Sequence, residues 1–206
     1  MSAQTRLCLG LLATLTLTAC SSASTHFYTL MSPADAREGQ RPVTPPGFQL
    51  DVGVVRVPVQ VDQPQLVVRE AGGGLAILET ERWSSPLADE FHDTLVDRLE
   101  SELGVRDLAG LPKSASVPVL GVQTEVRRFD SWPGQYALID VVWSLSLRQN
   151  GQPPRTLTCS STLRQPAGQS VQQVVLAHRE TIAALAATIA STARRWSQST
   201  NVQCPQ

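Results

Sequence analysis

The cysteine at position 20 has the sequence surroundings that most directly indicate chemistry. It follows Leu17-Thr18-Ala19, the end of an apolar stretch that begins at Leu7, and Arg6 is the only charged side chain before that stretch. A charged start, a short apolar core and small residues at its end are typical of a secretory signal peptide, and the stretch is shorter than the ~20 residues that span a bilayer. The pattern looks like a bacterial lipobox. We therefore expect residues 1–19 to be removed and Cys20 to carry lipid.

An ordinary signal peptide with a chance cysteine is the alternative interpretation. Lipoproteins with a pattern resembling this one carry three acyl chains, and each buried methylene contributes about 0.8 kcal/mol, so attachment would be effectively permanent. Residues 20–25 would then form a polar tether; the roughly five residues before the first strand span about 17 Å when extended. Ser21 stands where Gram-negative lipoproteins retained at the inner membrane usually have aspartate. By that resemblance we expect the outer membrane, with the domain on its periplasmic face.

Two further cysteines are predicted to form a disulfide. Cys8 leaves with the signal peptide and Cys20 takes the lipid, so Cys159 and Cys204 remain as one pair in an oxidising periplasm. A bond between them would close a long loop and contribute about 4 kcal/mol in the chain-entropy model. Two free buried thiols or a metal-binding pair are the alternatives, although no histidine and no third cysteine is close in the sequence.

The other residues of catalytic type form no recognisable site. His26, His92 and His178 are scattered, and no two of them have the spacing of metal ligands. The sequence contains no Gly-x-Ser-x-Gly nucleophile turn, no phosphate-binding P-loop and no His-Glu-x-x-His zinc motif. We therefore expect no enzymatic activity, no metal and no cofactor. A Ser/His/Asp triad assembled only in space is the alternative.

Length and composition favour one domain. The chain has 206 residues, of which 42% are hydrophobic and 17% charged, and its net charge is −1. These values are typical of a globular domain, which we place at residues 26–206, and they give no electrostatic reason to expect nucleic acid as a partner. The apolar segment from Thr181 to Thr192 is too short to span a membrane, so we expect it to be a buried helix.

The elements of the first half alternate between short strands and one helix. We expect strands at 26–31, 50–61, 65–69 and 75–79, with a proline-rich loop at 32–47. The inward-facing parity of the second strand changes at Val54-Val55, which indicates a bulge. A helix is predicted to begin with Ser85 as N-cap and Pro86 at its first position, and to end at Gly104. Its acidic residues, Asp89, Glu90 and Asp93 among them, are predicted to lie on a solvated face.

The second half reads as three strands and a long helix. Strands are expected at 117–129 and 137–147, with a turn at 130–134, and Asn150-Gly151 marks a hairpin. A strict two-residue turn would place Cys159 on the wrong face, so we expect one extra residue there and Cys159 opposite Trp143. A helix is predicted from a capping box at Ser170 to about residue 197. The fold class that follows is α+β, an antiparallel-rich sheet with two helices packed on one face.

Three groups of residues resemble the PqiC/YmbA family of ABC-type transport auxiliary lipoproteins. They are Phe27-Tyr28-Thr29-Leu30, the segment from Val57 to Arg69 with Val61-Asp62-Gln63-Pro64-Gln65, and Arg82-Trp83-Ser84-Ser85-Pro86-Leu87. The likeness covers nearly the whole mature chain. Two positions depart from the family pattern: Gln63 replaces a basic residue and Ser85 replaces an acid.

The resemblance implies a role in MCE-type intermembrane lipid transport. It implies an outer-membrane lipoprotein that docks the periplasm-spanning assembly of an MCE-domain protein, as a homo-oligomer, with phospholipid as a further candidate partner. A scaffold or activator of a cell-wall or secretion machine is the alternative. The candidate partner or subunit surface consists of Asp62, Gln63, Pro64, Gln65, Arg82 and Trp83. Pro64, Trp83 and Pro86 could instead simply set a turn, a core contact and a helix start.

Overall fold

The computed structural model describes residues 23–33, 44–199 and 201–205. The predicted signal peptide, Cys20 and the centre of the proline-rich loop lie outside these residues. Seven strands and two helices are formed in the described part. In chain order they are β1 (His26–Tyr28), β2 (Gln49–Arg56), β3 (Gln65–Arg69), β4 (Leu75–Trp83), α2 (Leu87–Leu103), β5 (Val119–Trp132), β6 (Tyr136–Arg148), β7 (Arg155–Pro166) and α3 (Val171–Gln198).

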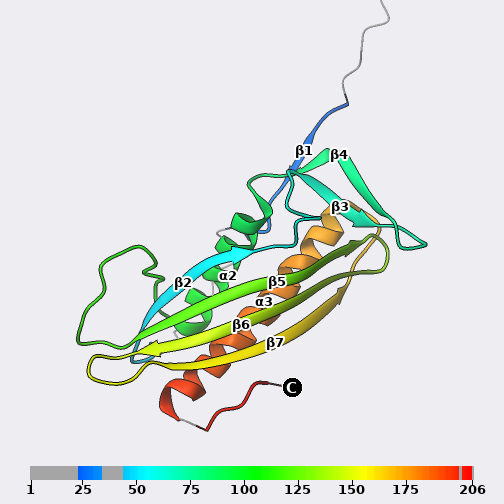
Figure 1. The fold of residues 1–206 in the computed structure, drawn as a ribbon. Coiled ribbons are helices and arrows are strands. Elements are labelled where there is room, and N and C mark those ends of the chain that lie inside the picture. Colours follow the sequence, from blue (N-terminus) through cyan, green and yellow to red (C-terminus); the bar gives the residue numbers. More distant parts are fainter. Residues whose placement is uncertain (1–22, 34–43, 200, 206) are drawn as a thin grey trace, which may run out of the picture.

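The larger sheet has four strands in the order β2-β5-β6-β7. β2 runs parallel to β5, and the β5–β6 and β6–β7 pairs are antiparallel. Both helices cover one face of this sheet and leave the other open, as Figure 1 shows. Along β6, residues alternate between buried and half-buried, which is the pattern of a strand with one face on a core. The predicted α+β class with two helices on one face is confirmed.

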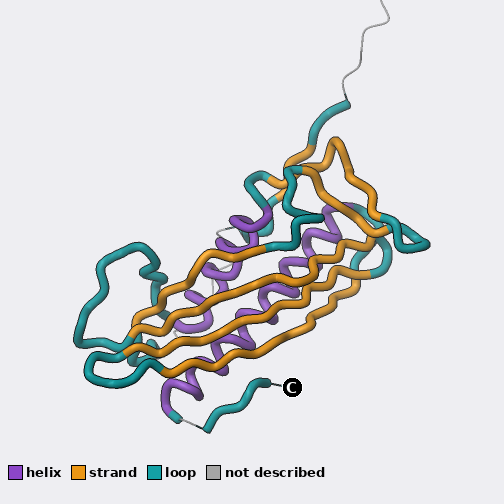
Figure 2. The backbone as a smooth tube through the Cα atoms, viewed as in Figure 1, coloured by secondary structure: helices purple, strands orange, loops and turns teal. Residues whose placement is uncertain are grey.

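A second, three-stranded sheet has the order β1-β4-β3 and lies at one end of the molecule. Figure 2 shows it beside the end of the β5–β6 hairpin. The sequence predicted one sheet and gave no indication that these strands form a separate one. β4 also continues to Trp83 and not to Glu79 as predicted, because residues 81–83 gain β1 as a parallel partner on their free edge. A strand pairing between segments so distant in sequence leaves no local signal.

The bulge predicted in β2 is present. The register of the β2–β5 pair shifts between Val52 and Val55. Leu50, Val52 and Val55 are therefore buried, whereas Val54 is 77% exposed. An extra residue in one strand restores the inward parity of those that follow.

β5 is longer than predicted and includes Asp130, Ser131 and Trp132, which the sequence placed in a turn. β6 pairs with β5 along its whole length, from Trp132–Tyr136 to Val119–Arg148, so the turn shrinks to residues 133–135. A second bulge lies between Val126 and Arg128.

The two helices begin differently. α2 has Pro86 as its N-cap with no side-chain cap, and the predicted N-cap Ser85 instead donates to Glu90. Ser85 is therefore a wrong prediction for the cap. α3 begins with the predicted capping box, in which the Ser170 hydroxyl accepts from the backbone N–H of Gln173. α2 ends as predicted at Gly104, whose φ of 70° is left-handed and favours glycine.

α3 is long and apolar enough to cross a membrane by length and composition. It is nevertheless the core helix of the domain, since one side of it packs on the sheet and on α2. The buried apolar residues of that side are Val174, Val175, Ile182, Leu185, Ile189 and Trp196.

The hairpin between β6 and β7 has the predicted register, with Trp143 opposite Cys159. Gly151 has a φ of 77° in the turn. Cys159 is joined by a disulfide to Cys204 on the tail that follows α3. The tail is thereby fixed against β7 at the edge of the sheet.

Candidate functional site

The N-terminal segment enters the domain over a buried carboxylate that the sequence analysis missed. Glu90, on the first turn of α2, is only 3% exposed. One of its oxygens accepts from the Thr29 hydroxyl and the Leu30 backbone N–H, each at 2.7 Å. The other accepts from the hydroxyls of Ser84 at 2.5 Å and Ser85 at 2.8 Å. Glu90 therefore ties the chain after β1 to the loop between β4 and α2.

The charged state of Glu90 is favoured. Burial alone would raise its pKa, but the hydrogen bonds from Ser84, Thr29, Leu30 and Ser85 outweigh burial and hold the pKa below its usual range. Its position in the first turn also suits the helix dipole. The prediction that Glu90 lies on a solvated face is wrong, and the adjacent hydroxyls of Ser84 and Ser85 are the local signal that could have indicated it.

Two arginines hold the same segment from the side of the helices. Arg179 of α3 donates to the Thr29 carbonyl oxygen at 2.8 Å, and Arg98 of α2 donates to the Ser32 hydroxyl at 2.7 Å. Burial and the nearby charge of Arg98 lower the pKa of Arg179, and the charge of Glu90 opposes this shift. Together with Glu90 these contacts hold residues 29–32 against the helices.

The six predicted surface residues come together beside this entry point. The Trp83 backbone N–H donates to the Pro64 carbonyl at 2.8 Å, and Gln65 pairs with Arg82 across the small sheet. Asp62 and Pro64 are exposed, whereas Gln63, Gln65 and Arg82 are half-buried.

Trp83 differs from the other five because it is only 5% exposed. Its ring meets that of Phe129 edge-on, with centroids 6.1 Å apart. Trp83 is therefore a core contact between the two sheets, as the alternative interpretation of this residue expected.

A serine and a histidine do meet in space, but without the arrangement of a catalytic triad. The Ser131 hydroxyl lies 2.9 Å from Nε2 of His178, and both residues are buried. No described residue hydrogen-bonds to Nδ1 of His178, where a triad places its orienting acid. The His178 ring is stacked on the Phe129 ring, and the two ring centroids lie 3.8 Å apart. Burial lowers the pKa of His178 to about 3, although the charge of Asp130 opposes this. His178 is thus neutral in the folded protein above about pH 3.

The other histidines lie apart from this pair. His26 contacts Glu81, and His92 contacts Asp93, each at 3.1 Å on the surface. Across residues 23–33, 44–199 and 201–205, no three His, Cys, Asp or Glu side chains come together as a metal site would require.

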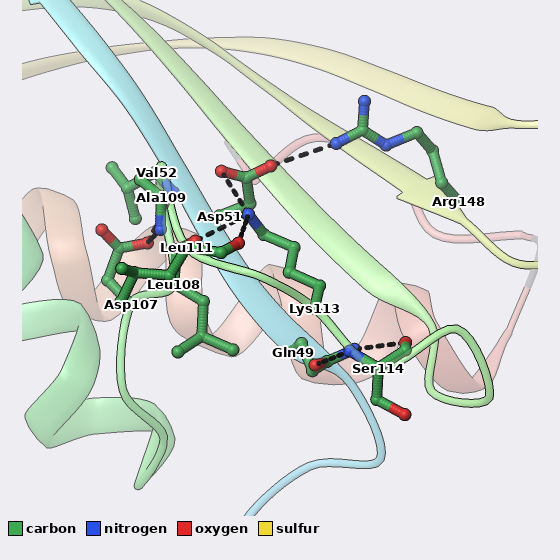
Figure 3. A network of polar contacts seen from close by, with 10 residues as sticks. All are labelled: Gln49, Asp51, Val52, Asp107, Leu108, Ala109, Leu111, Lys113, Ser114 and Arg148. Carbon is green, nitrogen blue, oxygen red and sulfur yellow. Dashed lines mark hydrogen bonds and ion pairs between the residues drawn. The ribbon is translucent and has the colours of Figure 1, made fainter.

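The opposite end of the domain carries a loop, residues 104–118, that is held rigidly to β2 (Figure 3). One oxygen of Asp107 accepts from the backbone N–H groups of Val52 and Ala109, at 2.8 and 3.2 Å. Lys113 donates to the Leu108 carbonyl at 2.6 Å and lies 3.5 Å from Asp51, which also pairs with Arg148 at 3.1 Å. These contacts join the loop to the edge of the larger sheet.

Further along the same loop, Ser114 and Gln49 exchange two hydrogen bonds of 2.8 and 2.9 Å. Leu111 is 58% exposed and Val117 is 36% exposed on this fixed loop. A hollow of about 370 Å³ lies between the loop and the β6–β7 hairpin. Apolar side chains held on a rigid frame next to a hollow are what a docking partner can use.

The two ends are separated by the length of the helices. Glu90 of α2 and Arg179 of α3 lie at the end where the chain enters, whereas Arg194 of α3 donates to the Leu103 carbonyl at the other end. The helices therefore run in the same direction along the sheet, as Figure 1 shows. At 1.5 Å per residue, α3 extends about 40 Å.

Comparison with known proteins identifies the family. Residues 28–190 match the model of a family described as "ABC-type transport auxiliary lipoprotein component". The chain belongs to this family. As an ABC-type transport auxiliary lipoprotein it serves a transporter, and the match extends from β1 into the last third of α3, so it covers both ends of the domain described above.

Two solved structures are similar to this auxiliary lipoprotein in fold. An uncharacterized protein aligns with a TM-score of 0.61 and 20% identity, over 82% of this chain and 98% of that one. A Xanthomonas campestris protein of the family DUF330 aligns with a TM-score of 0.56 and 19% identity, over 86% of this chain and 96% of that one. A search among curated proteins gives no significant match.

Proposed function

We propose that this protein is the outer-membrane lipoprotein of an MCE-type intermembrane lipid transport system, and that it docks the periplasm-spanning MCE assembly at the outer membrane. The family match over residues 28–190 is the observation that carries the proposal. The family serves ABC-type transporters, and a lipoprotein anchored in the opposite membrane is suited to hold the far end of an assembly that crosses the periplasm.

In this proposal Cys20 carries the lipid. Five residues lie between Cys20 and His26, where β1 begins. Glu90, Arg98 and Arg179 fix the chain directly after β1. The end of the domain with the small sheet therefore faces the anchoring membrane. The loop at residues 104–118 faces away from it, toward a partner that arrives from the other side.

The two candidate surfaces then have different roles. Leu111 and Val117, on the distal loop, contact the MCE assembly. Asp62, Gln63, Gln65 and Arg82 lie near the membrane end, where neighbouring anchored subunits stand at equal height, so they contact another copy of the chain in a homo-oligomer.

The proposal makes the domain a binding module and not an enzyme. Its support is the Ser131–His178 pair, which is buried and has no acid at Nδ1 among the described residues. Labelling of the intact protein by a fluorophosphonate would contradict this part.

Co-isolation from crosslinked envelopes tests the proposal. The lipidated wild-type chain should recover an MCE-domain protein, and Leu111→Asp should reduce that recovery strongly. Leu176→Asp is the matched control, because Leu176 is 45% exposed on α3 near the membrane end. Recovery of peptidoglycan synthases and no MCE protein would contradict the proposal and favour the scaffold alternative.

A further inference from the structure

A groove of about 360 Å³ lies between the small sheet and the end of β5. Its walls come from β3, from the β3–β4 hairpin, from the chain after β2 and from residues 127–131 of β5. Neither the family description nor the docking role assigns anything to this groove.

Arginines dominate the charge of the groove. Arg69, Arg127 and Arg128 line it, and Asp130 is the one acid in its lining. Asp130 pairs with Arg69 at 2.9 Å and with Arg128 at 2.5 Å. The side chain of Arg127 is exposed and makes no hydrogen bond or ion pair with a described residue. Three guanidinium groups and one carboxylate therefore line the groove, so its lining carries a net positive charge.

The second bulge in β5 produces this arrangement. It lies between Val126 and Arg128, so two consecutive arginines point away from the core, where a regular strand would turn one of them inward. Arg128 stands opposite Asp140, on the face that the helices leave open.

The rim of the groove is apolar and exposed. Leu75 lines it and is 49% exposed, and Val59, 83% exposed, lies between the lining residues Pro58 and Gln60. Ile77 is also 49% exposed and stands opposite the lining residue Val67. Of these three exposed residues, Leu75 belongs to the lining itself, and Val59 and Ile77 adjoin it through neighbouring residues.

The groove also lies on the small sheet, which the anchored chain enters through β1. Arginine guanidinium groups match the geometry of phosphate oxygens, and apolar side chains beside them suit the glycerol and first acyl carbons. We propose that this groove binds the phosphate of an anionic phospholipid, with Val59, Leu75 and Ile77 against its acyl chains. The inference rests on the proposed function for its membrane-side orientation, and it adds a lipid site to a docking module.

Native mass spectrometry of the lipidated full-length chain in a neutral detergent tests this site. Titration with phosphatidylglycerol should give a bound-lipid adduct, and phosphatidylcholine should bind at least about tenfold more weakly, since it carries no net charge. Replacing the arginines by Arg127→Gln with Arg128→Gln should weaken the phosphatidylglycerol adduct about tenfold or more. Arg106→Gln with Arg195→Gln removes the same charge elsewhere and should leave the adduct unchanged.

Two further arms separate the sources of binding. Leu75→Ser should weaken the binding of phosphatidylglycerol but should not change any binding of inorganic phosphate. Retention of inorganic phosphate without lipid, equal adducts in the groove and control variants, or no phosphatidylglycerol adduct would each overturn the proposal. Because the Arg127 side chain has no partner among the described residues, the single variant Arg127→Gln should keep the thermal midpoint. It should show the same direction of effect if the double variant unfolds.

The same preparations distinguish this inference from the docking role. If the groove variants lose lipid and still recover the MCE-domain protein, both proposals stand. If the wild-type chain recovers that protein but binds no phosphatidylglycerol, only the lipid site fails. If it binds phosphatidylglycerol through the arginines but recovers no transporter, the docking role fails and the lipid site stands.

Discussion

Arg69 of β3 and Asp130 of β5 form an ion pair of 2.9 Å that joins the two sheets at the end of the domain where the chain enters. Asp130 is nearly buried and the Arg69 side chain is 29% exposed, so the pair is better shielded from solvent than a surface ion pair. The hydrogen bond to Asp130 raises the pKa of Arg69, against the effect of burial.

We expect a double-mutant cycle with Arg69→Gln and Asp130→Asn to give a coupling of about 1 kcal/mol in the free energy of unfolding. Asp51→Asn with Arg148→Gln provides a control cycle, because the Arg148 side chain is 59% exposed and its coupling should be smaller. Urea unfolding of the four proteins in each cycle measures both. Equal coupling in the two cycles would contradict the link between the sheets.

Glu90→Gln should destabilise the protein by about 3 kcal/mol, because an amide cannot accept all four hydrogen bonds that the carboxylate accepts. Asp89→Asn is the control, since Asp89 is exposed one position earlier on the same turn. Thermal unfolding measures the difference. Hydrogen exchange should also show faster exchange at the Leu30 N–H in Glu90→Gln, and unchanged protection there would contradict the clamp.

His178 should make stability fall in acid. Its folded pKa, about 3, lies below the unfolded value near 6.5, so between these values the unfolded chain binds the proton and the folded chain does not. The stability that neutral His178 contributes to the folded state is complete above about pH 6.5. It is lost as the pH falls toward 3, by at most about 1.4 kcal/mol per pH unit.

Urea unfolding at a series of pH values measures this slope. His178→Gln removes the titrating group and should flatten the dependence of stability on pH between about pH 6 and 4. This range lies between the ordinary pKa of histidine and the lowered pKa of His178. His92→Gln, which alters a surface histidine, should keep the wild-type slope. A wild-type slope in His178→Gln would show that His178 is not neutral and buried.

Removal of the disulfide by Cys159→Ser with Cys204→Ser should lower the free energy of unfolding by about 2–4 kcal/mol. A reducing agent should lower the stability of the wild type to a similar degree and leave the double variant unchanged. Stability that is insensitive to reduction in the wild type would show that the bond is absent or contributes nothing.

The sequence predicted best where the signal is local or periodic. The alternation along β6 and the position of Gly151 were sufficient to predict that Trp143 pairs with Cys159. The change of inward-facing parity at Val54-Val55 was sufficient to predict the bulge in β2. The capping box at Ser170 follows from residues three apart. Each of these features depends on neighbours within a few positions of the chain.

The features that were missed depend on contacts between distant segments. Glu90 is buried because β1, far away in sequence, delivers Thr29 and Leu30 to it. β4 continues to Trp83 for the same reason, and the arginine groove exists only where β3 meets the end of β5. Of the predicted surface, Trp83 lies in the core because its indole meets Phe129, a residue whose position no local pattern fixes.

The parallel pairing of β1 with β4 has a mechanical consequence. The chain enters β1 from its amino-terminal side, so under the proposed function tension between the lipid on Cys20 and a load on residues 104–118 would act along the strand. Such a force loads all the hydrogen bonds between β1 and β4 in shear at the same time, so they do not break one after another. The contacts of Glu90 and Arg179 just beyond β1 would share that stress, so the attachment should withstand force well for a strand of three residues.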